Sequence, residues 1–238
     1  EFLSIWNGVV MGGGVGLSLY GDHRLATDNT KFAMPETAIG FFPDVGGSYF
    51  LSNLPGNFGK YIALTSEVLT INELLFFGLA THYYELTEFE NIKDKFINYG
   101  KIFSKKYEIS NDSFIIKNIN LINDIFNGNI HEVIKNLKED GSEFSNKNLE
   151  ILLKKCPMSL AITTKLIENA KGKSLKECLE IEFQLSQKIV YRDDFDNGVN
   201  SVLVSKDHKP KWNPANIDEI NINDLDKYFE THTETLYL

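Results

Sequence analysis

In "VVMGGGVGLSLYGDHRLAT", residues 9–27, three consecutive glycines separate a β-like run from a run of small residues. Glycines cost conformational entropy on folding, so we expect another group to approach this backbone or to use its N–H groups. An anion, a phosphate, or a carbonyl oxygen that becomes an oxyanion would suit such a place. The same glycines are also compatible with a turn or with close packing.

The spacing excludes three familiar glycine motifs. The dinucleotide pattern GxGxxG would place its third glycine at Leu17 or Leu19. A Walker A loop ending at Lys173 would need a glycine at Ile167. The nucleophile elbow GxSxG fails because neither candidate serine has the second glycine. An oxyanion site, in which a backbone N–H at a helix start meets developing negative charge, fits the residues.

Composition narrows the classes of partner. The chain has 238 residues, 42% of them hydrophobic, and a formal net charge of -9. This charge disfavours nucleic-acid binding, and no apolar run approaches the ~18 residues that span a membrane. The two cysteines, Cys156 and Cys178, form no CxxC pair and fit buried thiols, and the five histidines show no ligand spacing. We expect no metal site, no nucleic-acid partner and no membrane partner.

The pattern of residues predicts an α/β part, 1–85, followed by a helical part, 86–238. A buried strand is expected over residues 2–10, and a short helix over residues 12–21. In the helical part, Ser174 and Glu177 form a capping box that begins a helix, with an apolar face through Leu175, Leu179 and Phe183. The chain opens without Met inside an apolar run, so we expect a fragment that lacks its N-terminal part.

Two carboxylates lie in "FAMPETAIGFFPDVGGSYF", residues 32–50. Glu36 and Asp44 each follow a proline and are separated by apolar residues. Apolar surroundings disfavour the ionised carboxylate and raise its pKa toward values useful for proton transfer, and two such groups can divide acid and base roles. Both also precede expected helices, and Asp44 is a natural N-cap for the following helix. Chemistry and capping therefore both remain open on this stretch.

The ordered segments resemble the crotonase (enoyl-CoA hydratase/isomerase) superfamily. The resemblance begins with "NGVVMGGGVGLSLYGDHRLAT" and "KFAMPETAIGFFPDVGG". It continues through "GLATHYYE", "NLKEDGSEF", "CPMSLAIT", "EFQLSQ" and "DDFDNGVNSVLVSKDHKPKWNP", and so covers almost the whole chain. The helical segments favour the branch that hydrolyses 3-hydroxyacyl-CoA thioesters in valine breakdown. The resemblance implies a spiral of ββα units with a helical C-terminal region over the site.

The resemblance also assigns site residues. Gly13, the middle glycine, matches one backbone N–H donor of the oxyanion hole, with Gly12 beside it at the substrate. Glu36 matches the catalytic glutamate, and Asp44 matches the second carboxylate of the hydrolase branch. The other N–H donor belongs to an upstream segment in this family. Hydratases carry a further glutamate where this chain has Gly16, which counts against ordinary hydration.

We therefore expect hydrolysis of a short 3-hydroxyacyl-CoA to the free acid and CoA. CoA is then part of the substrate, and no cofactor is needed. An enoyl-CoA hydratase or a dienoyl-CoA isomerase is the nearest alternative, and a non-catalytic scaffold or assembly protein is the second. The resemblance implies a homo-oligomer, trimer or hexamer, and a mitochondrial matrix location. We expect the 238-residue piece alone to be inactive or nearly so.

Overall fold

The computed structural model describes residues 1–102, 106–110, 112–231 and 236. The contacts group the chain into two compact units, each built from two stretches. The first unit comprises Glu1–Ala33 and Val68–Ile119, and the second comprises Met34–Glu67 and Asn120–Leu238. Neither unit ends at Leu86, where the sequence predicts the change from α/β to helical structure, because residues 34–67 pack with the later helices. Each unit is described by itself.

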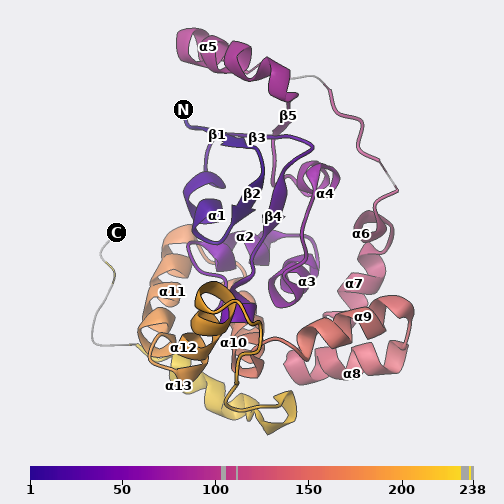
Figure 1. The fold of residues 1–238 in the computed structure, drawn as a ribbon, viewed down its shortest axis with the longest axis vertical. Helices are drawn as coiled ribbons and strands as arrows, with labels where there is room; N and C mark the ends of the chain where they lie inside the picture. Colours follow the sequence, from indigo (N-terminus) through magenta and orange to yellow (C-terminus); the bar gives the residue numbers. More distant parts are fainter. Residues whose placement is uncertain (103–105, 111, 232–235, 237–238) are drawn as a thin grey trace. The chain divides into compact units, whose positions relative to one another are not determined.

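The first unit holds the strands (Figure 1). Strands β1 (Leu3–Trp6), β3 (His23–Ala26) and β5 (His82–Tyr83) form a parallel sheet in the order β1-β3-β5. Strands β2 (Val9–Met11) and β4 (Lys31–Ala33) form a second parallel pair. The short helix α1 (Gly13–Ser18) follows β2. The strand predicted over residues 2–10 is thus two strands, because the chain changes sheets at Asn7-Gly8.

Helices complete the first unit. They are α4 (Ile71–Phe76), the 3-10 turn η2 (Leu86–Glu88), α5 (Phe89–Tyr99) and α6 (Phe114–Lys117). Trp6 of β1 and Phe32 of β4, both buried, pack with ring centroids 5.7 Å apart, so that the three-stranded sheet contacts the two-stranded one. Helix α4 begins with a capping box in which Thr70 and Glu73 bond each other's backbone N–H, as its residues favour.

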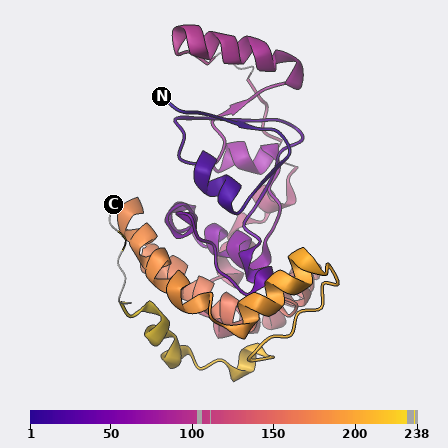
Figure 2. The ribbon, with the colours of Figure 1, turned by 60° about the vertical axis from the view of Figure 1, so that its left-hand side comes forward.

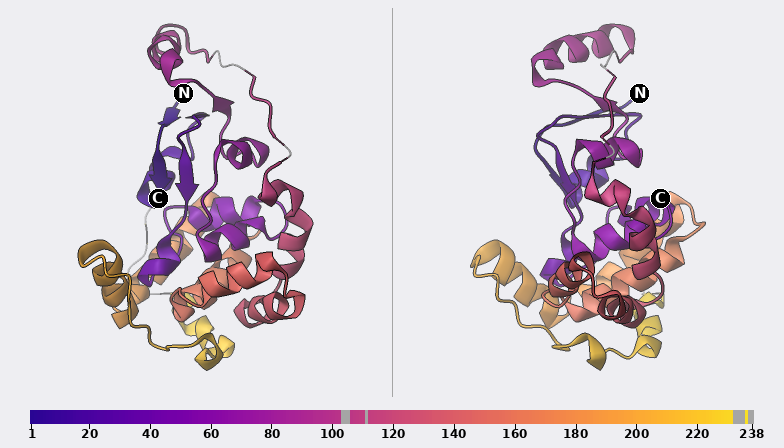
Figure 3. Two further views of the ribbon diagram at one scale, coloured as in Figure 1. Left: turned by 45° about the vertical axis from the view of Figure 1, so that its right-hand side comes forward. Right: turned by 90° about the vertical axis from the view of Figure 1, so that its right-hand side faces the viewer.

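The second unit is helical in its described residues. Its first stretch contains the 3-10 turn η1 (Glu36–Ile39), α2 (Gly47–Asn53) and α3 (Phe58–Thr65). Its second stretch contains α7 (Ile119–Ile125), α8 (Ile130–Asp140), α9 (Glu143–Leu152), α10 (Pro157–Ala170), α11 (Leu175–Ile189) and α12 (Asp193–Val199). It ends with η3 (Asn200–Val204), η4 (Ile217–Glu219), η5 (Ile222–Leu225) and α13 (Asp226–Phe229). Helices α8 and α9 lie side by side (Figure 3), and α13 lies along α11 (Figure 2).

Helix α11 shows how burial departs from the predicted apolar face. The capping box of Ser174 and Glu177 begins the helix as predicted. Its fully buried positions, however, are Cys178, Glu182, Leu185 and Ile189, whereas the predicted stripe of leucine and phenylalanine is only half-buried. A carboxylate therefore occupies the buried face of this helix. Within the part of the chain that the structure describes, no helix combines the length and apolarity that crossing a membrane requires.

Candidate active site

Glu36 is a buried carboxylic acid at the first position of η1, directly after Pro35. Its side chain is 5% exposed, and no described residue provides a hydrogen-bond partner for its Oε2 atom. Burial raises the pKa of Glu36 to about 8, the neighbouring charge of Asp44 raises it further, and a hydrogen bond from its own backbone N–H and the positive charge of Lys155 oppose the rise. A buried acid with one unpartnered oxygen and such a pKa is typical of proton-transfer sites.

The turn that carries Glu36 is held against α12 by close backbone contact. Gly40 ends η1 with a φ of +74°, a conformation that favours glycine, and a Cβ there would lie 2.3 Å from the Asp194 carbonyl oxygen. The Asp194 carboxylate is itself fully buried and accepts hydrogen bonds from the Arg192 guanidinium and from the backbone N–H of Asn213. This network fixes α12, and through α12 it fixes the position of Glu36.

Asp44 is the second predicted carboxylate, and the structure places it in the same compact unit as Glu36. It is half-buried in the loop that precedes α2, and burial raises its pKa. The two carboxylates are near enough to raise the pKa of Glu36 through their repulsion. Asp44 is not the N-cap of α2, because the cap is Gly46 and Asp44 contributes only its backbone oxygen, to the N–H of Gly47 at 2.7 Å. Its side chain is thus not used to begin the helix.

Glu182 takes the capping role instead, and the sequence analysis missed it. From the buried face of α11, its carboxylate accepts hydrogen bonds from the N–H of Gly46 at 2.7 Å and from the N–H and Oγ of Ser48 at 2.9 Å and 2.5 Å. Burial raises the pKa of Glu182 to about 7, although these hydrogen bonds favour its ionised form. Glu182 therefore holds the loop that carries Asp44. The signal that could have revealed it is a glutamate at helical spacing among buried apolar positions.

Aromatic side chains pack together on the segment between Glu36 and Asp44 and on α12. Phe41 and Phe42 stack with centroids 4.4 Å apart, and Phe41 also contacts Phe195 of α12 at 5.3 Å. Phe42 is fully buried, whereas Phe41 and Phe195 remain half-buried. Apolar rings therefore pack along the segment that links Glu36 and Asp44, the two carboxyl groups whose pKa values burial raises.

The glycine triplet belongs to the other compact unit. Gly12 is the N-cap of α1, with a φ of +52°, and its carbonyl accepts hydrogen bonds from the N–H groups of Val15 and Gly16. Gly13 opens the helix and is exposed, so its N–H has no acceptor within α1. A Cβ at Gly13 or Gly14 would meet no atom within 4 Å. Crowding therefore does not require these two glycines, and the oxyanion role of Gly13 stays a prediction.

The structure also shows the surroundings of the two cysteines and of Lys60. Cys156 and Cys178 are both buried, and burial raises the pKa of each thiol. Lys60 is buried, and its Nζ donates hydrogen bonds to the Gly128 carbonyl and to Glu168. Among the described residues, no three His, Cys, Asp or Glu side chains gather as metal ligands would.

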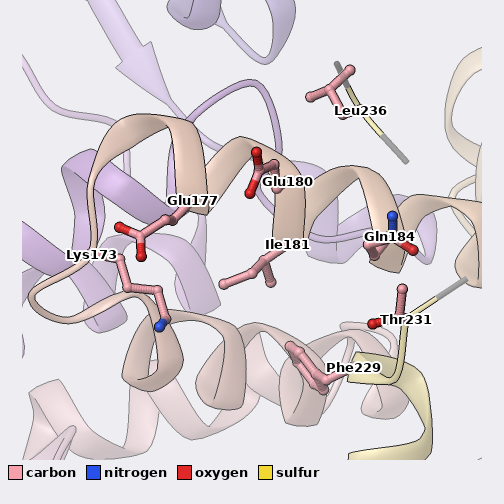
Figure 4. A pocket seen from close by; sticks show the side chains of 8 residues that line it. All are labelled: Lys173, Glu177, Glu180, Ile181, Gln184, Phe229, Thr231 and Leu236. Carbon is pink, nitrogen blue, oxygen red and sulfur yellow. The ribbon is translucent and has the colours of Figure 1, made fainter. Parts of the chain in front are cut away.

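A separate groove runs along α11 in the second unit (Figure 4). Its volume is about 460 Å³. Ile181 and Phe229 provide its apolar surface, and Lys173, Glu180 and Gln184 line it with polar groups. None of these side chains is fully buried, whereas the carboxyl group of Glu36 is. We therefore place the candidate active site at Glu36 and Asp44.

Comparison with known proteins places the chain in a family. A sequence model of the enoyl-CoA hydratase/isomerase family matches residues 1–229, and the chain belongs to this family. The solved structure of a carnitinyl-CoA dehydratase from Mycobacterium thermoresistibile is 30% identical, has a TM-score of 0.89, and aligns over 99% of this chain and 69% of its own. An enoyl-CoA hydratase from Rhodobacter sphaeroides has the same TM-score at 23% identity, over 96% of this chain and 68% of its own. The predicted crotonase-like fold class is confirmed.

Relatives in several organisms carry one name. The proteins called "3-hydroxyisobutyryl-CoA hydrolase, mitochondrial" are 40% identical in Xenopus laevis, 38% in Homo sapiens and 42% in Dictyostelium discoideum. Each alignment covers 96 or 97% of this chain and 63% of the relative. The chain thus spans less than two thirds of the length of these relatives. The predicted resemblance to the family, and within it to this group, is confirmed.

Proposed function

We propose that the protein hydrolyses the thioester of 3-hydroxyisobutyryl-CoA, or of a similar short 3-hydroxyacyl-CoA, to the free acid and CoA. The observation that carries the proposal is the buried Glu36 carboxyl group, unpartnered at Oε2 and electrostatically coupled to Asp44. The relatives at 38–42% identity are named for this hydrolysis. A carboxyl group with a pKa of about 8 is suited to exchange a proton with water near neutral pH.

Two routes for Glu36 fit the geometry, and both begin from its ionised form. As a general base, Glu36 takes a proton from water while the water oxygen bonds to the thioester carbonyl carbon. As a nucleophile, a Glu36 oxygen bonds to that carbon, the C–S bond breaks, and water then hydrolyses the resulting anhydride. In either route the CoA sulfur leaves with the C–S electron pair and gains a proton. CoA enters as part of the substrate and leaves as the free thiol, and the reaction needs no cofactor.

Asp44 assists at the same site in this proposal. Its half-buried side chain, not used as a helix cap, is available to orient the attacking water, to pass a proton to the leaving sulfur, or to accept a hydrogen bond from the substrate hydroxyl. The Gly13 N–H, next to Gly12, stabilises the carbonyl oxygen as it becomes negative. An acyl-CoA is thus the proposed partner. A trimer or hexamer and a mitochondrial matrix location are proposed from the family and from the names of the relatives.

The release of free thiol from 3-hydroxyisobutyryl-CoA by the full-length protein that carries this chain tests the proposal. We expect rapid release, reduced about 10²–10⁴-fold by Glu36→Gln, because the amide cannot accept the proton or form the anhydride. Glu150→Gln makes the same chemical change on an exposed side chain of α9 and should leave the rate unaltered. The 238-residue chain alone is expected to be inactive or nearly so, and turnover near that of the full-length protein would refute this.

The carnitinyl-CoA dehydratase at 30% identity makes hydration or isomerisation of an enoyl-CoA the second candidate. Gly16 opposes hydration, since the family's hydratases carry a second glutamate there. Loss of the enoyl absorbance of a 2-enoyl-CoA, with no thiol release, would replace the hydrolase proposal with this one. Activity on neither substrate would support the non-catalytic scaffold.

A further inference from the structure

Lys155 is a lysine of the candidate site that the sequence analysis did not single out. It lies between α9 and α10, and its side chain is only half-buried, unlike the exposed neighbour Lys154. Its Nζ donates a hydrogen bond of 2.8 Å to Ser66 Oγ. Burial lowers the pKa of Lys155 to about 8, although the nearby charge of Glu36 opposes this shift. The ammonium group is therefore kept near Glu36 despite a cost in solvation.

Two contacts fix Lys155 beside the turn that carries Glu36. The backbone N–H of Cys156 donates to the carbonyl oxygen of Thr37 at 3.1 Å, which joins the start of α10 to η1. The Thr37 hydroxyl also lies 3.4 Å from Ser66 Oγ, the group that receives the lysine. Both the backbone next to Lys155 and the partner of its side chain are thus attached to the residue that follows Glu36.

Ser66, which accepts the hydrogen bond from Lys155, has an unusual backbone conformation. It ends α3 with a φ of +60°, in the left-handed region that residues other than glycine seldom adopt. Such conformations cost free energy and persist where the surrounding structure requires them. Here the conformation is combined with a hydroxyl group that lies between Lys155 and Thr37. Ser66 therefore ends α3 and also links Lys155 to Thr37 through its hydroxyl group.

Several other charged groups face η1 or its surroundings. Asp44 acts on Glu36 in the opposite sense to Lys155, and the charge of Asp44 also raises the pKa of Glu182. The other ionisable groups on or next to the elements that pack against η1 are the ion pairs Arg192–Asp194, Lys60–Glu168 and Lys165–Asp226, the exposed Asp193 and Asp196, and the buried Cys156 and Tyr61. Lys155 is thus the cation that acts on Glu36 among these described groups.

We propose that Lys155 is a positioning residue whose ammonium group, anchored by Ser66, stabilises the ionised carboxylate of Glu36. The inference rests on the proposed function, because hydrolysis by either route needs Glu36 in its ionised form. Lys155 itself forms no bond to the substrate. Its effect is to raise the fraction of Glu36 that is ionised at a given pH, against the opposing effects of burial and of Asp44.

Two measurements on the full-length protein test this role. The first is titration of the Glu36 carboxyl group by isotope-edited infrared spectroscopy, with Glu36→Gln to identify the band. The second is the pH dependence of thiol release. Lys155→Met should raise the pKa of Glu36 by about one unit or more, since an opposite charge at short range shifts a carboxyl by this amount. At pH values below the Glu36 pKa of both the parent and Lys155→Met, thiol release by the variant should be about tenfold slower for each unit by which the pKa of Glu36 has risen.

Three further variants make the result specific. Lys155→Arg keeps the positive charge and should restore most of the shift, whereas a purely steric role would not predict this rescue. Ser66→Ala removes the anchor and should raise the pKa of Glu36 by less than Lys155→Met does. Lys154→Met, the same change on the exposed neighbouring side chain, should leave the pKa and the rate unchanged.

An unchanged Glu36 titration in a folded Lys155→Met protein would overturn the proposal, as would equal shifts in Lys155→Met and Lys154→Met. The titration does not depend on turnover. A shifted Glu36 titration in a protein that releases no thiol would therefore refute the proposed hydrolysis while supporting the electrostatic role of Lys155. Thiol release together with an unchanged Glu36 titration in Lys155→Met would support the proposed hydrolysis and refute the electrostatic role of Lys155.

Discussion

Gly198 of α12 lies against the backbone of Ile39 so closely that a Cβ atom on this glycine would be 2.3 Å from the Ile39 carbonyl carbon. Backbone cannot move aside as a flexible side chain can, and Ile39 belongs to the same short turn as Glu36. The contact therefore links the stability of the second unit to the position of its buried carboxyl group.

Gly198→Ala should destabilise the protein by about 1–3 kcal/mol, the usual cost of forcing an extra methyl group into a packed interior. It should also lower thiol release, because η1 must shift. Urea unfolding of the full-length protein measures the first effect. Gly14→Ala is the control, since a Cβ there meets no atom within 4 Å. Equal stability of the two variants would show that the contact relaxes without cost.

The stability of the folded protein should fall between pH 5 and pH 8. The pKa of Glu36 is about 8 in the folded protein and 4.5 ordinarily, so the folded chain retains a proton in this window that the unfolded chain has released. Rising pH then favours the unfolded state, by about 1.4 kcal/mol per pH unit for each such proton. Glu182, with a pKa of about 7, acts in the same direction up to pH 7. This sign is opposite to that of a carboxylate in an ion pair.

Above about pH 8, Lys155 should make the stability of the folded protein rise with pH. Its folded-state pKa of about 8 lies below the usual 10.5, so the unfolded chain binds the extra proton between these values and stability rises with pH. A minimum near pH 8 is the expected result of urea unfolding at a series of pH values. Glu36→Gln should flatten the slope between pH 7 and pH 8, and an unaltered slope in this variant would contradict the assignment.

Asp44→Asn should separate the two roles of this carboxylate. Loss of its proton chemistry should lower thiol release about 100-fold. Removal of its negative charge should at the same time lower the pKa of Glu36, so the rate should begin to rise at lower pH than in the parent. The pH profile of kcat/KM measures both the lower rate and the lower pKa of Glu36. Asp124→Asn, on the exposed surface of α7, is the control. A profile displaced to higher pH would be inconsistent with the repulsion between the two carboxylates.

Glu182→Ala should cost about 2–5 kcal/mol of stability. It leaves the buried N–H groups of Gly46 and Ser48 without their acceptor, at about 1–3 kcal/mol each. Glu182→Gln should cost less stability than Glu182→Ala, because the amide oxygen still accepts a hydrogen bond. It should still cost some stability, because the NH₂ group cannot accept one. Thermal and urea unfolding measure the difference, and Glu180→Ala on the same helix is the reference. The role of Glu182 as a cap is excluded if Glu182→Ala is as stable as that reference.

Local signals in the sequence predicted several elements correctly. The capping boxes that begin α4 and α11 depend on residues three positions apart, so their side chains meet whenever the helix forms. The short helix after the glycine triplet follows from an equally local pattern. Glu36 was found because an acid among apolar residues is unusual at any position, and its burial is confirmed.

What the sequence by itself determined is therefore several local elements, the family and the acidic residue among apolar neighbours, because each depends on neighbours along the chain or on an ordered set of motifs. Only the tertiary structure decided which groups act on that residue. Glu182 meets Gly46 and Ser48 across 136 and 134 positions, and Lys155 meets Ser66 across 89. No spacing in the sequence encodes such pairs, since they arise when separate helices bury their faces against one another. The protonation of Glu36 is set first by its burial, which segments distant in sequence create together, and then by the charges of Asp44 and Lys155, because a charge acts through space and not along the chain.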